Sequence, residues 1–412
     1  MSPPRRVLVL DGHSNQALAC VRSLGRAGHD VFVSSYRRWP LAGWSRYSRG
    51  QHQLVSQDLA GYTELRAWAA AKEIQVVLPL LEGGCLVLNA ERSAWERAGM
   101  AVACGPDELL QHAFDKTRTM QTAESCGVRI PRTHYPQSMS DARAAVDEIG
   151  LPCVVKPRTS EVLRDGRVHK SPGIGFITNA EEIEQVVVSR RHAGQWPLIQ
   201  EFVPGHTAGA FALCDHGRAV AWFAHESLRD VRPLASPSCL RRSIAVSPRL
   251  REPAERLLQA MHWHGPAMVE FRDDGVSPPC LMEVNGRFWH SLELAVASGA
   301  DFPRWWLRLL ENQPIEESTD FRTGVVVRWL WGDVKRCLYT FRGPPAGYPG
   351  KHLTLWRGLR DTIGPQPPNT RLEMWQRDDP LPAIGEWLEG IRGVISNQMA
   401  SRHDLNPALE TP

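Results

Sequence analysis

The chain has 412 residues, of which 42% are hydrophobic and 23% are charged, a balance typical of a globular protein with two or three domains. The net charge of +3 is small and no long run of lysines or arginines occurs, so the composition does not indicate a nucleic-acid partner. No apolar stretch reaches the roughly 18 residues of a membrane span, and the nine cysteines are scattered without a CxxC pair, so we expect no membrane partner, no disulfide framework and a cytoplasmic protein.

Short apolar runs alternate with helical patterns in the first quarter of the chain. The ranges 5–10, 31–34 and 74–81 are predicted to be buried strands, and the spacing of apolar residues predicts helices over 17–24 and 62–72. Strand–helix alternation of this kind indicates an open α/β sheet, whose ligands bind at the carboxyl ends of the strands.

Two loops, 11–15 and 82–84, follow such strand ends and are either ligand-binding loops or only turns. The dinucleotide fingerprint GxGxxG is absent, because DGHSNQALA supplies one glycine where three are needed. The Walker sequence GxxxxGK[ST] is absent as well. The first sheet is therefore not predicted to bind a nucleotide in either of these two ways.

The pattern changes after residue 110. A helix is predicted over 114–126, and the strands that follow are read from LPCVVKP, LIQEFVPG, AMVEF and CLMEVN. A long polar stretch (159–170) precedes the glycine-containing turn SPGIGF. The tail opens with VVVRWLWGD and contains two Pro/Gly-rich breaks, RGPPAGYPG and GPQPPN.

The segment AMVEFRDDGVSPPCLMEVNGRF brings acidic side chains together. Glu283 and Asn285 point to the same side of a strand because side chains alternate. The intervening DDGVSPP can reverse the chain, which places Glu270 beside Glu283 in a hairpin. Carboxylate and amide oxygens suit Mg²⁺, and Arg287 projects to the same side, where it can bind an anionic oxygen. The alternative is an ordinary solvated hairpin with alternating charges.

Two lysines and two loops suggest a nucleotide nearby. Lys116 lies at a predicted helix start and Lys156 at a strand end, where a compact positive charge suits phosphate, although each alone is more often a surface lysine. The amides of SPGIGF can cover phosphates, because glycine lets the backbone approach closely. The segment LIQEFVPG offers a backbone edge beside Phe202 and Val203 that can bind an adenine ring.

The order of these motifs resembles the ATP-grasp superfamily of the carbamoyl-phosphate synthase and biotin carboxylase type. Over about residues 112–311 the order runs DK, GVRIPRT, VVKP, a glycine loop, QEFVPG, MVEF and MEVNGR. The preceding strand–helix segment resembles the pre-ATP-grasp domain, and RWLWGD and DPLP resemble the tail of a carboxylate–amine ligase-like branch. The resemblance implies an α/β fold: a Rossmann-like pre-ATP-grasp domain (1–111), an ATP-grasp α+β domain (112–314) and a small C-terminal extension (315–412).

The resemblance also assigns roles to individual residues. The phosphates of ATP are expected at the two lysines and the glycine loop, and adenine at QEFVPG. The residues concerned are Lys116, Lys156, Ser171, Gly173, Gly175, Glu201, Phe202 and Val203. Two Mg²⁺ ions, or Mn²⁺ in their place, are expected on Glu270, Glu283 and Asn285. The catalytic roles fall to Arg287, at the transferred phosphoryl group, and Arg241, facing the acid substrate.

Two positions depart from the family pattern, and the role of a pair of arginines stays open. Thr207 stands near the place where many members have an acidic residue that binds ribose, so this contact is in doubt. Gly286 replaces the proline of an NPR sequence and is expected to loosen the turn. Arg241 and Arg242 in CLRRS either face the acid or form a basic patch on a loop.

A zinc site at His262, His264 and His290 is not predicted, because no third ligand is evident in HWHGP.

The resemblance implies an ATP-dependent ligase that joins a small-molecule carboxylate to an amine. The carboxylate would be activated as an acyl phosphate, and an amide or peptide bond would form with release of ADP and phosphate. Other ATP-grasp chemistry, a small-molecule kinase and a non-catalytic nucleotide-binding module remain alternatives. A homodimer is compatible with the sequence, which names neither the acid nor the amine.

Overall fold

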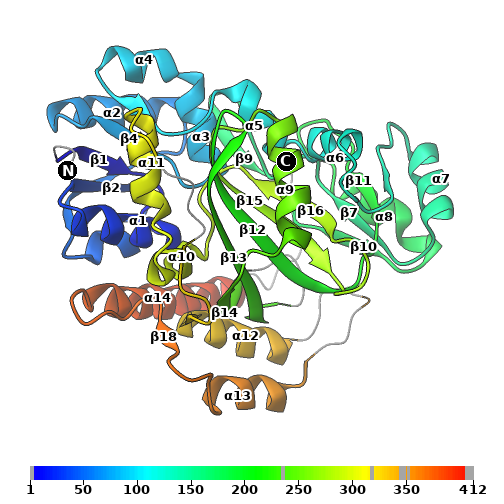
Figure 1. The fold of residues 1–412 in the computed structure, drawn as a ribbon. Coiled ribbons are helices and arrows are strands. Elements are labelled where there is room, and N and C mark those ends of the chain that lie inside the picture. Colours follow the sequence, from blue (N-terminus) through cyan, green and yellow to red (C-terminus); the bar gives the residue numbers. More distant parts are fainter. Residues whose placement is uncertain (1–3, 233–236, 316–319, 343–348, 350–352, 404–412) are drawn as a thin grey trace.

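The computed structural model describes residues 4–232, 237–315, 320–342, 349 and 353–403 (Figure 1). Three large sheets and a separate hairpin organise these residues. In the described parts, no helix combines the length and the apolar character that crossing a membrane requires. The domain boundaries after residues 111 and 314 stay a prediction.

The N-terminal sheet is parallel throughout and has the strand order β3-β2-β1-β4-β5. Its strands are β1 (Arg6–Val9), β2 (Asp30–Ser35), β3 (Ser48–Gln53), β4 (Val76–Leu78) and β5 (Ala101–Val102). Helix α1 (Asn15–Arg26) covers one face, and α2 (Leu59–Ala71), α3 (Glu82–Ala90) and α4 (Arg92–Arg97) cover the other (Figure 1). The predicted α/β sheet is confirmed. The expected turn at 82–84 is wrong, since these residues form the first turn of α3.

The second sheet is antiparallel, with the order β10-β7-β11-β6. It consists of β6 (Thr133–His134), β7 (Cys153–Lys156), β10 (Gly175–Ile177) and β11 (Leu198–Glu201). Apolar residues of α7 (Met139–Ile149) and α8 (Ile183–Val188) form a core with this sheet, and the short η2 (Ala180–Glu182) leads into α8.

The polar stretch 159–170 forms a hairpin, β8 (Glu161–Arg164) and β9 (Arg167–Lys170), where no structure was predicted. Leu163 and Val168 pack against the core of the N-terminal sheet, and the Leu59 amide donates to the Gly166 carbonyl over 2.9 Å. The hairpin therefore fixes the segment before the glycine loop to the N-terminal part of the chain.

The largest sheet has the order β16-β15-β12-β13-β14-β17-β18. Its strands are β12 (His206–Asp215), β13 (Arg218–Asp230), β14 (Ser238–Ile244), β15 (Gly265–Asp273), β16 (Cys280–Asn285), β17 (Val326–Arg328) and β18 (Arg371–Leu372). One face packs against α5 (Asp107–Phe114), α6 (Lys116–Ser125) and α9 (Pro248–Ala260), and the other against α1, α10 (Leu292–Ser298) and α11 (Phe302–Leu310). The helix predicted over 114–126 is confirmed as α6, which begins two residues later because Asp115 caps it and separates it from α5.

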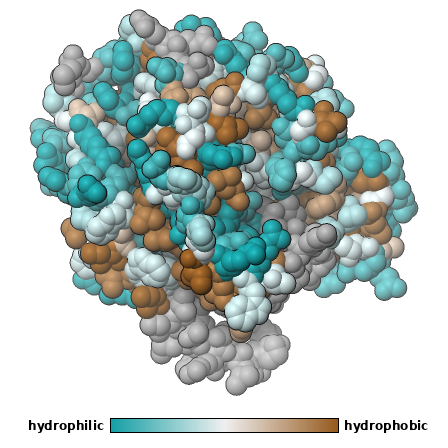
Figure 2. Space-filling model, turned by 60° about the horizontal axis from the view of Figure 1, so that its bottom comes forward, coloured by the Kyte–Doolittle hydropathy of each residue, from teal (hydrophilic) through white to brown (hydrophobic). Residues whose placement is uncertain are grey.

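The C-terminal segment packs against the largest sheet and against the N-terminal part of the chain. Helix α12 (Leu330–Arg342) packs beside β14, α13 (Leu355–Ile363) packs on α12, and α14 (Leu381–His403) packs on η1 (Leu41–Trp44) (Figure 1). The predicted break RGPPAGYPG lies almost wholly outside the described residues, whereas GPQPPN forms the connection from α13 to β18. Viewed from below, hydrophobic and hydrophilic residues are interspersed (Figure 2), and exposed apolar side chains include Phe341, Trp356 and Ile363.

Candidate functional site

The hairpin of β15 and β16 places two carboxylates opposite each other. Glu270 pairs with Glu283 in the antiparallel register, as predicted, and the register shifts between Glu270 and Phe271. Phe271 pairs with Leu281, so Met282 is the extra residue of a β-bulge. Because bulges redirect the side chains beside them, this bulge helps to aim Glu283 towards the same space as Glu270.

A chain of hydrogen bonds links Glu283 to two further residues on the same side of β16. The Asn285 side-chain amide donates to Glu283 Oε1 over 3.0 Å, and Arg287 Nη2 donates to Asn285 Oδ1 over 3.0 Å. Arg287 Nη2 also lies 3.8 Å from Glu82 Oε1 at the start of α3. The predicted set of Glu283, Asn285 and Arg287 is thus held together, and Glu82 joins it from the N-terminal sheet.

The two carboxylates have opposite pKa shifts. Burial, together with repulsion by Glu283, raises the pKa of Glu270 to about 8. Burial alone would raise the pKa of Glu283 as well. The charge of Lys116, the hydrogen bond from Asn285 and the charge of Lys156 outweigh burial and hold the pKa below its ordinary value. Two carboxylates that face each other without a cation between them can hold one proton between them, and a divalent cation would neutralise the same repulsion.

Lys116 and Lys156 reach the carboxylates from different elements. Asp115 caps α6 by accepting from the Thr117 amide over 2.9 Å, and its carboxylate binds Arg158 Nε over 2.9 Å. This arrangement fixes Lys116, whose Nζ lies 3.1 Å from Ser160 Oγ. Lys156 ends β7, and burial lowers the pKa of its ammonium group to about 8.

A cavity of about 470 Å³ joins these side chains, a size usual for a small-molecule site. Most of the residues predicted to bind nucleotide or metal line it: Lys116, Lys156, Ser171, Gly173, Glu201, Phe202, Val203, Glu270, Glu283, Asn285 and Arg287. Gly175 does not line it, because it begins β10 and its α-carbon faces Val186. The glycine loop therefore contributes residues 171–174 to the cavity, together with Phe176.

The predicted adenine segment lies at the end of β11. Glu201 Oε2 accepts from Arg132 Nε over 3.2 Å, and the Glu201 amide donates to the Arg132 carbonyl over 2.9 Å. The chain then leaves the strand through Phe202 and Val203, which form part of the cavity wall. Thr207 does not line this cavity.

A second cavity of about 380 Å³ meets the first at the carboxylates. Both are lined by Leu81, Glu270, Arg272, Glu283, Asn285 and Arg287. Arg241 lines only the second cavity, on β14, and its guanidinium is fully buried. It forms an ion pair with Glu373, and its Nη1 lies 2.9 Å from the Ser238 carbonyl and 3.3 Å from His290 Nδ1. The charge of Arg241 is therefore already balanced by a residue of the C-terminal segment.

Sequence patterns missed several cavity residues. Arg272 lies two residues after Glu270 on the same strand, so strand alternation could have identified it. Glu82 was considered only as part of a loop, and nothing in the sequence pointed to Ser160. Nor did it point to Glu373, which lines neither cavity but pairs with Arg241. His290 lines the second cavity, whereas His264 lies at the other end of the large sheet and His262 is exposed, so these three histidines do not meet.

Gly286 is required by packing, which corrects the expectation that it loosens the turn. A β-carbon at this position would lie 2.3 Å from Cη2 of Trp263 and 3.0 Å from the Ala113 side chain. Trp263 is buried and its Nε1 donates to the Pro266 carbonyl over 3.2 Å, so the ring is held in place. The close approach fixes the backbone between Asn285 and Arg287.

Comparison with known proteins agrees with this geometry. The family described as "ATP-grasp in the biosynthetic pathway with Ter operon" matches residues 199–332. The D-alanine–D-alanine ligase of Ectopseudomonas mendocina (strain ymp) is 26% identical over 217 residues, which is 48% of this chain and 65% of the ligase. The chain thus spans slightly less than two thirds of the length of this relative.

Two solved biotin carboxylases share the fold. The β,γ-ATP complex of biotin carboxylase from Campylobacter jejuni has a TM-score of 0.63 at 16% identity and covers 79% of this chain and 74% of its own. The biotin carboxylase domain dimer of Hydrogenobacter thermophilus 2-oxoglutarate carboxylase, in complex with MgADP, ADP and bicarbonate, has a TM-score of 0.61 with the same identity and coverage. The matched family, the related ligase and the shared fold lead to one conclusion: the chain belongs to the ATP-grasp superfamily.

Proposed function

We propose that this protein is an ATP-dependent ligase that activates a small-molecule carboxylate as an acyl phosphate and joins it to an amine. The observation that carries the proposal is that two cavities meet at Glu270, Glu283, Asn285 and Arg287. A nucleotide in the first cavity and an acid in the second would bring the γ-phosphate and the carboxylate together at this junction. Phosphoryl transfer needs chiefly such positioning and charge stabilisation.

The residues of the first cavity fit ATP with Mg²⁺. Glu270 and Glu283 face each other across the hairpin, and Glu82 Oε2 and Arg287 Nε are buried without a hydrogen-bond partner. Such unsatisfied polar atoms are costly unless a ligand pairs with them. Glu270, Glu283 and Asn285 would hold the ions, two if the pattern of the superfamily is followed. Mg²⁺ held there would supply charge neutralisation for the phosphates.

The chain's own cations supply the remaining charge stabilisation. Lys116 and Lys156 approach from the side of the first cavity, and Arg287 lies at the junction with the second. In this position Arg287 can contact the phosphoryl group as it moves from ATP to the acid. Phe202 and Val203 provide an apolar wall, and the backbone of 171–174 can cover the phosphates.

The second cavity fits an anionic substrate. Its charged lining combines four arginines, Arg232, Arg241, Arg272 and Arg287, with Asp230, Glu270 and Glu283. Since Glu373 balances Arg241, we assign Arg241 the role of positioning the cavity wall, and Arg272 and Arg287 that of binding the carboxylate. The amine would attack the acyl phosphate from this cavity. A homodimer is part of the proposal too, on the example of the Hydrogenobacter domain dimer.

The test is a screen for ADP formation by the purified chain with ATP, Mg²⁺ and a matrix of carboxylates and amines. A ligase forms ADP at a sustained rate only when both substrates are present, whereas a kinase needs the acid alone. With the active pair, Glu283→Gln is expected to lower the rate by roughly 10²–10³, the usual cost of an electrostatic contact to a transferring group.

A matched control keeps the experiment interpretable. Asp274→Asn makes the same carboxylate-to-amide change on the same hairpin, but Asp274 lies in the exposed turn and accepts hydrogen bonds from the Val276 and Ser277 amides, which an asparagine oxygen can also accept. The control should keep the wild-type rate and melting temperature. Equal rates for Glu283→Gln and wild type would remove Glu283 from the site and refute the proposal.

A further inference from the structure

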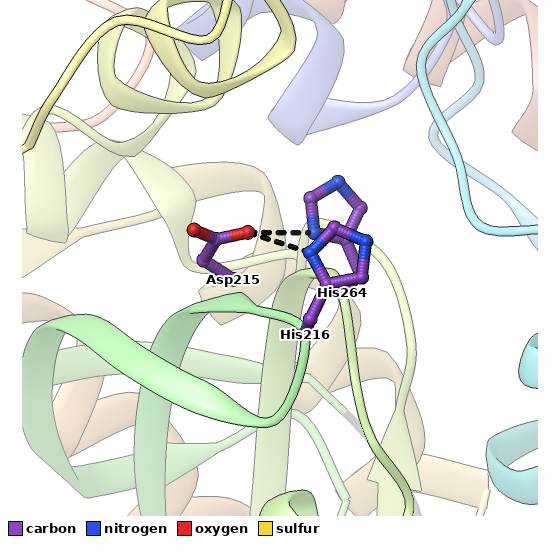
Figure 3. Close-up of side chains that lie close together, drawn as sticks. All are labelled: Asp215, His216 and His264. Carbon is purple, nitrogen blue, oxygen red and sulfur yellow. Dashed lines mark hydrogen bonds and ion pairs between the residues drawn. The ribbon is translucent and has the colours of Figure 1, made fainter.

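Three metal-binding side chains converge at the end of the large sheet opposite the cavities. Asp215 ends β12, His216 lies in the turn to β13, and His264 directly precedes β15. Their ligand atoms all lie within 4.8 Å of one another. His216 Nδ1 is 2.7 Å and His264 Nδ1 is 3.5 Å from the same oxygen, Asp215 Oδ1, and the three side chains point towards a common space (Figure 3).

We propose that Asp215, His216 and His264 form a binding site for a divalent transition-metal ion, with Zn²⁺ as the ion that best suits two imidazoles and one carboxylate. Zn²⁺ binds nitrogen and oxygen ligands at roughly 2.0–2.2 Å, so ligand atoms around it lie about 3.3 Å apart. The present separations lie on either side of this value, and small side-chain rotations would bring all three atoms into range. Three protein ligands would leave a fourth position for water.

The backbone holds the ligand-bearing segments together before any metal binds. Cys214 pairs with Gly265 in the register of β12 and β15, and the Gly217 amide donates to the Trp263 carbonyl over 2.7 Å. These contacts join the β12–β13 turn to the segment that carries His264. The metal would therefore strengthen an existing contact between two parts of the chain that are distant in sequence.

His216 occupies a turn position that histidine does not usually favour. Asp215 pairs with Arg218, so the turn has two central residues, and both have positive φ, 47° at His216 and 87° at Gly217. Asparagine followed by glycine is the preferred sequence in such a turn. Histidine there places an imidazole, whose side chain is 79% exposed, directly beside Asp215.

His264 is oriented from its other side by an aromatic ring. Its ring centroid lies 5.3 Å from that of Trp306 in an edge-on arrangement and 4.2 Å from that of His216. His264 Nδ1 is buried and has no hydrogen bond of good geometry, because Asp215 is 3.5 Å away.

This site is separate from the proposed ligase centre. Glu270 follows Gly265 by five positions along β15, which corresponds to roughly 17 Å along an extended strand. A metal at this distance cannot contact the phosphates, so its role would be to fix the β12–β13 turn against β15. The inference does not rest on the proposed ligase function.

The test measures Zn²⁺ binding to the full-length protein, stripped of metal, by calorimetric titration in excess Mg²⁺. Two variants remove one ligand each, His264→Gln and His216→Asn. The second keeps the turn, because asparagine is favoured at that position. The control is His262→Gln, which removes an exposed histidine two residues from His264. Cobalt substitution supplies an independent signal, the visible absorption of bound Co²⁺.

Wild type and His262→Gln should bind one equivalent of Zn²⁺. His264→Gln and His216→Asn should bind Zn²⁺ at least about 100-fold more weakly or not at all, because even the loss of a ligand's outer-shell partner lowers metal affinity by about 10–100-fold. The Co²⁺ absorption and the Zn²⁺-dependent rise in melting temperature should disappear in the same two variants. If circular dichroism shows that His216→Asn is folded and this variant binds Zn²⁺ with the stoichiometry and affinity of wild type, the proposal is overturned. Absence of binding by wild type at micromolar Zn²⁺ would leave only an Asp–His ion pair and overturn it as well.

Discussion

Substitution of Arg22 by methionine should destabilise the protein strongly, although Arg22 lines neither cavity. The guanidinium is fully buried on α1 and pairs with Asp379, which is 1% exposed, at 2.8 Å. It also donates to the carbonyls of Glu373, Met374 and Asp379 over 2.8–3.0 Å. This single side chain therefore anchors the segment that follows β18 to the N-terminal sheet.

The magnitude follows from what the substitution leaves behind. Methionine retains the length of the side chain but leaves a buried Asp379 carboxylate without its cation and three buried carbonyls without a donor. Asp379 keeps its hydrogen bonds from Ser45 Oγ, at 2.7 Å, and from the Arg46 amide, at 2.8 Å. Removal of one partner of a buried ion pair typically costs about 3–5 kcal/mol, a large share of the roughly 5–15 kcal/mol that stabilises a native protein.

The assay is urea unfolding of Arg22→Met, followed by circular dichroism, with Arg26→Met as the matched control. Arg26 lies one turn further along α1 and pairs with Asp378, the neighbour of Asp379, but that pair is solvent-exposed, 35% and 46% for the two side chains. An exposed pair contributes about 0–1 kcal/mol. The control should therefore lose far less stability than Arg22→Met.

The functional consequence is equally specific. Glu373, whose carbonyl accepts from Arg22, uses its carboxylate to balance Arg241 in the second cavity. Release of this segment should therefore weaken binding of the acid substrate as well as stability. If Arg22→Met loses no more than about 1 kcal/mol, or no more than Arg26→Met, the buried pair does not anchor the C-terminal segment and the reasoning fails.

Three further predictions concern the site and its surroundings. Gly286→Ala should lose about 1–3 kcal/mol of stability and most activity, because its β-carbon would lie 2.3 Å from the Trp263 ring; a stability gain, as glycine-to-alanine changes give where space allows, would contradict this. Burial, with the charge of Arg241, lowers the pKa of His225 in the folded protein to about 3. Below the unfolded-state pKa of about 6.5 the unfolded chain therefore binds more protons than the folded one, so stability decreases as the pH is lowered. Between pH 6.5 and pH 5 this group should cost wild type about 2 kcal/mol at 1.36 kcal/mol per unit, and unfolding curves of His225→Gln that keep the same pH dependence would argue against it. Residues 173–174 should exchange amide hydrogens rapidly in the free protein and slowly with ATP and Mg²⁺, while Phe176 in β10 stays protected; slow exchange of 173–174 in both states would exclude a lid.

Local patterns were sufficient for the elements that carry the chemistry. Alternation along AMVEF and CLMEVN predicted that Glu270 and Glu283 share one side of a hairpin, and the register confirms it. The lysine at the start of α6 and the lysine at the end of β7 were also placed correctly. Such predictions succeed because a strand's two faces and a helix's first turn depend on neighbouring residues alone.

The sequence did not reveal contacts between distant segments. Arg241 was expected to face the substrate, but packing of the C-terminal segment brings Glu373 to it and balances its charge inside the fold. The polar stretch 159–170 gave no strand signal, yet it forms a hairpin because Leu163 and Val168 bury against the N-terminal core. Both outcomes depend on surfaces supplied by other parts of the chain.

Packing also decided two positions that spacing alone misread. Gly286 was expected to loosen a turn, whereas the Trp263 ring leaves no room for a side chain. His264 was grouped with His262 and His290 by proximity in the sequence or by residue type, but the pairing of β12 with β15 places it beside Asp215 and His216. Sequence alone therefore predicted the local elements, and most of the site residues it named line the first cavity. The tertiary structure decided how charges and space are shared, because those depend on which elements meet.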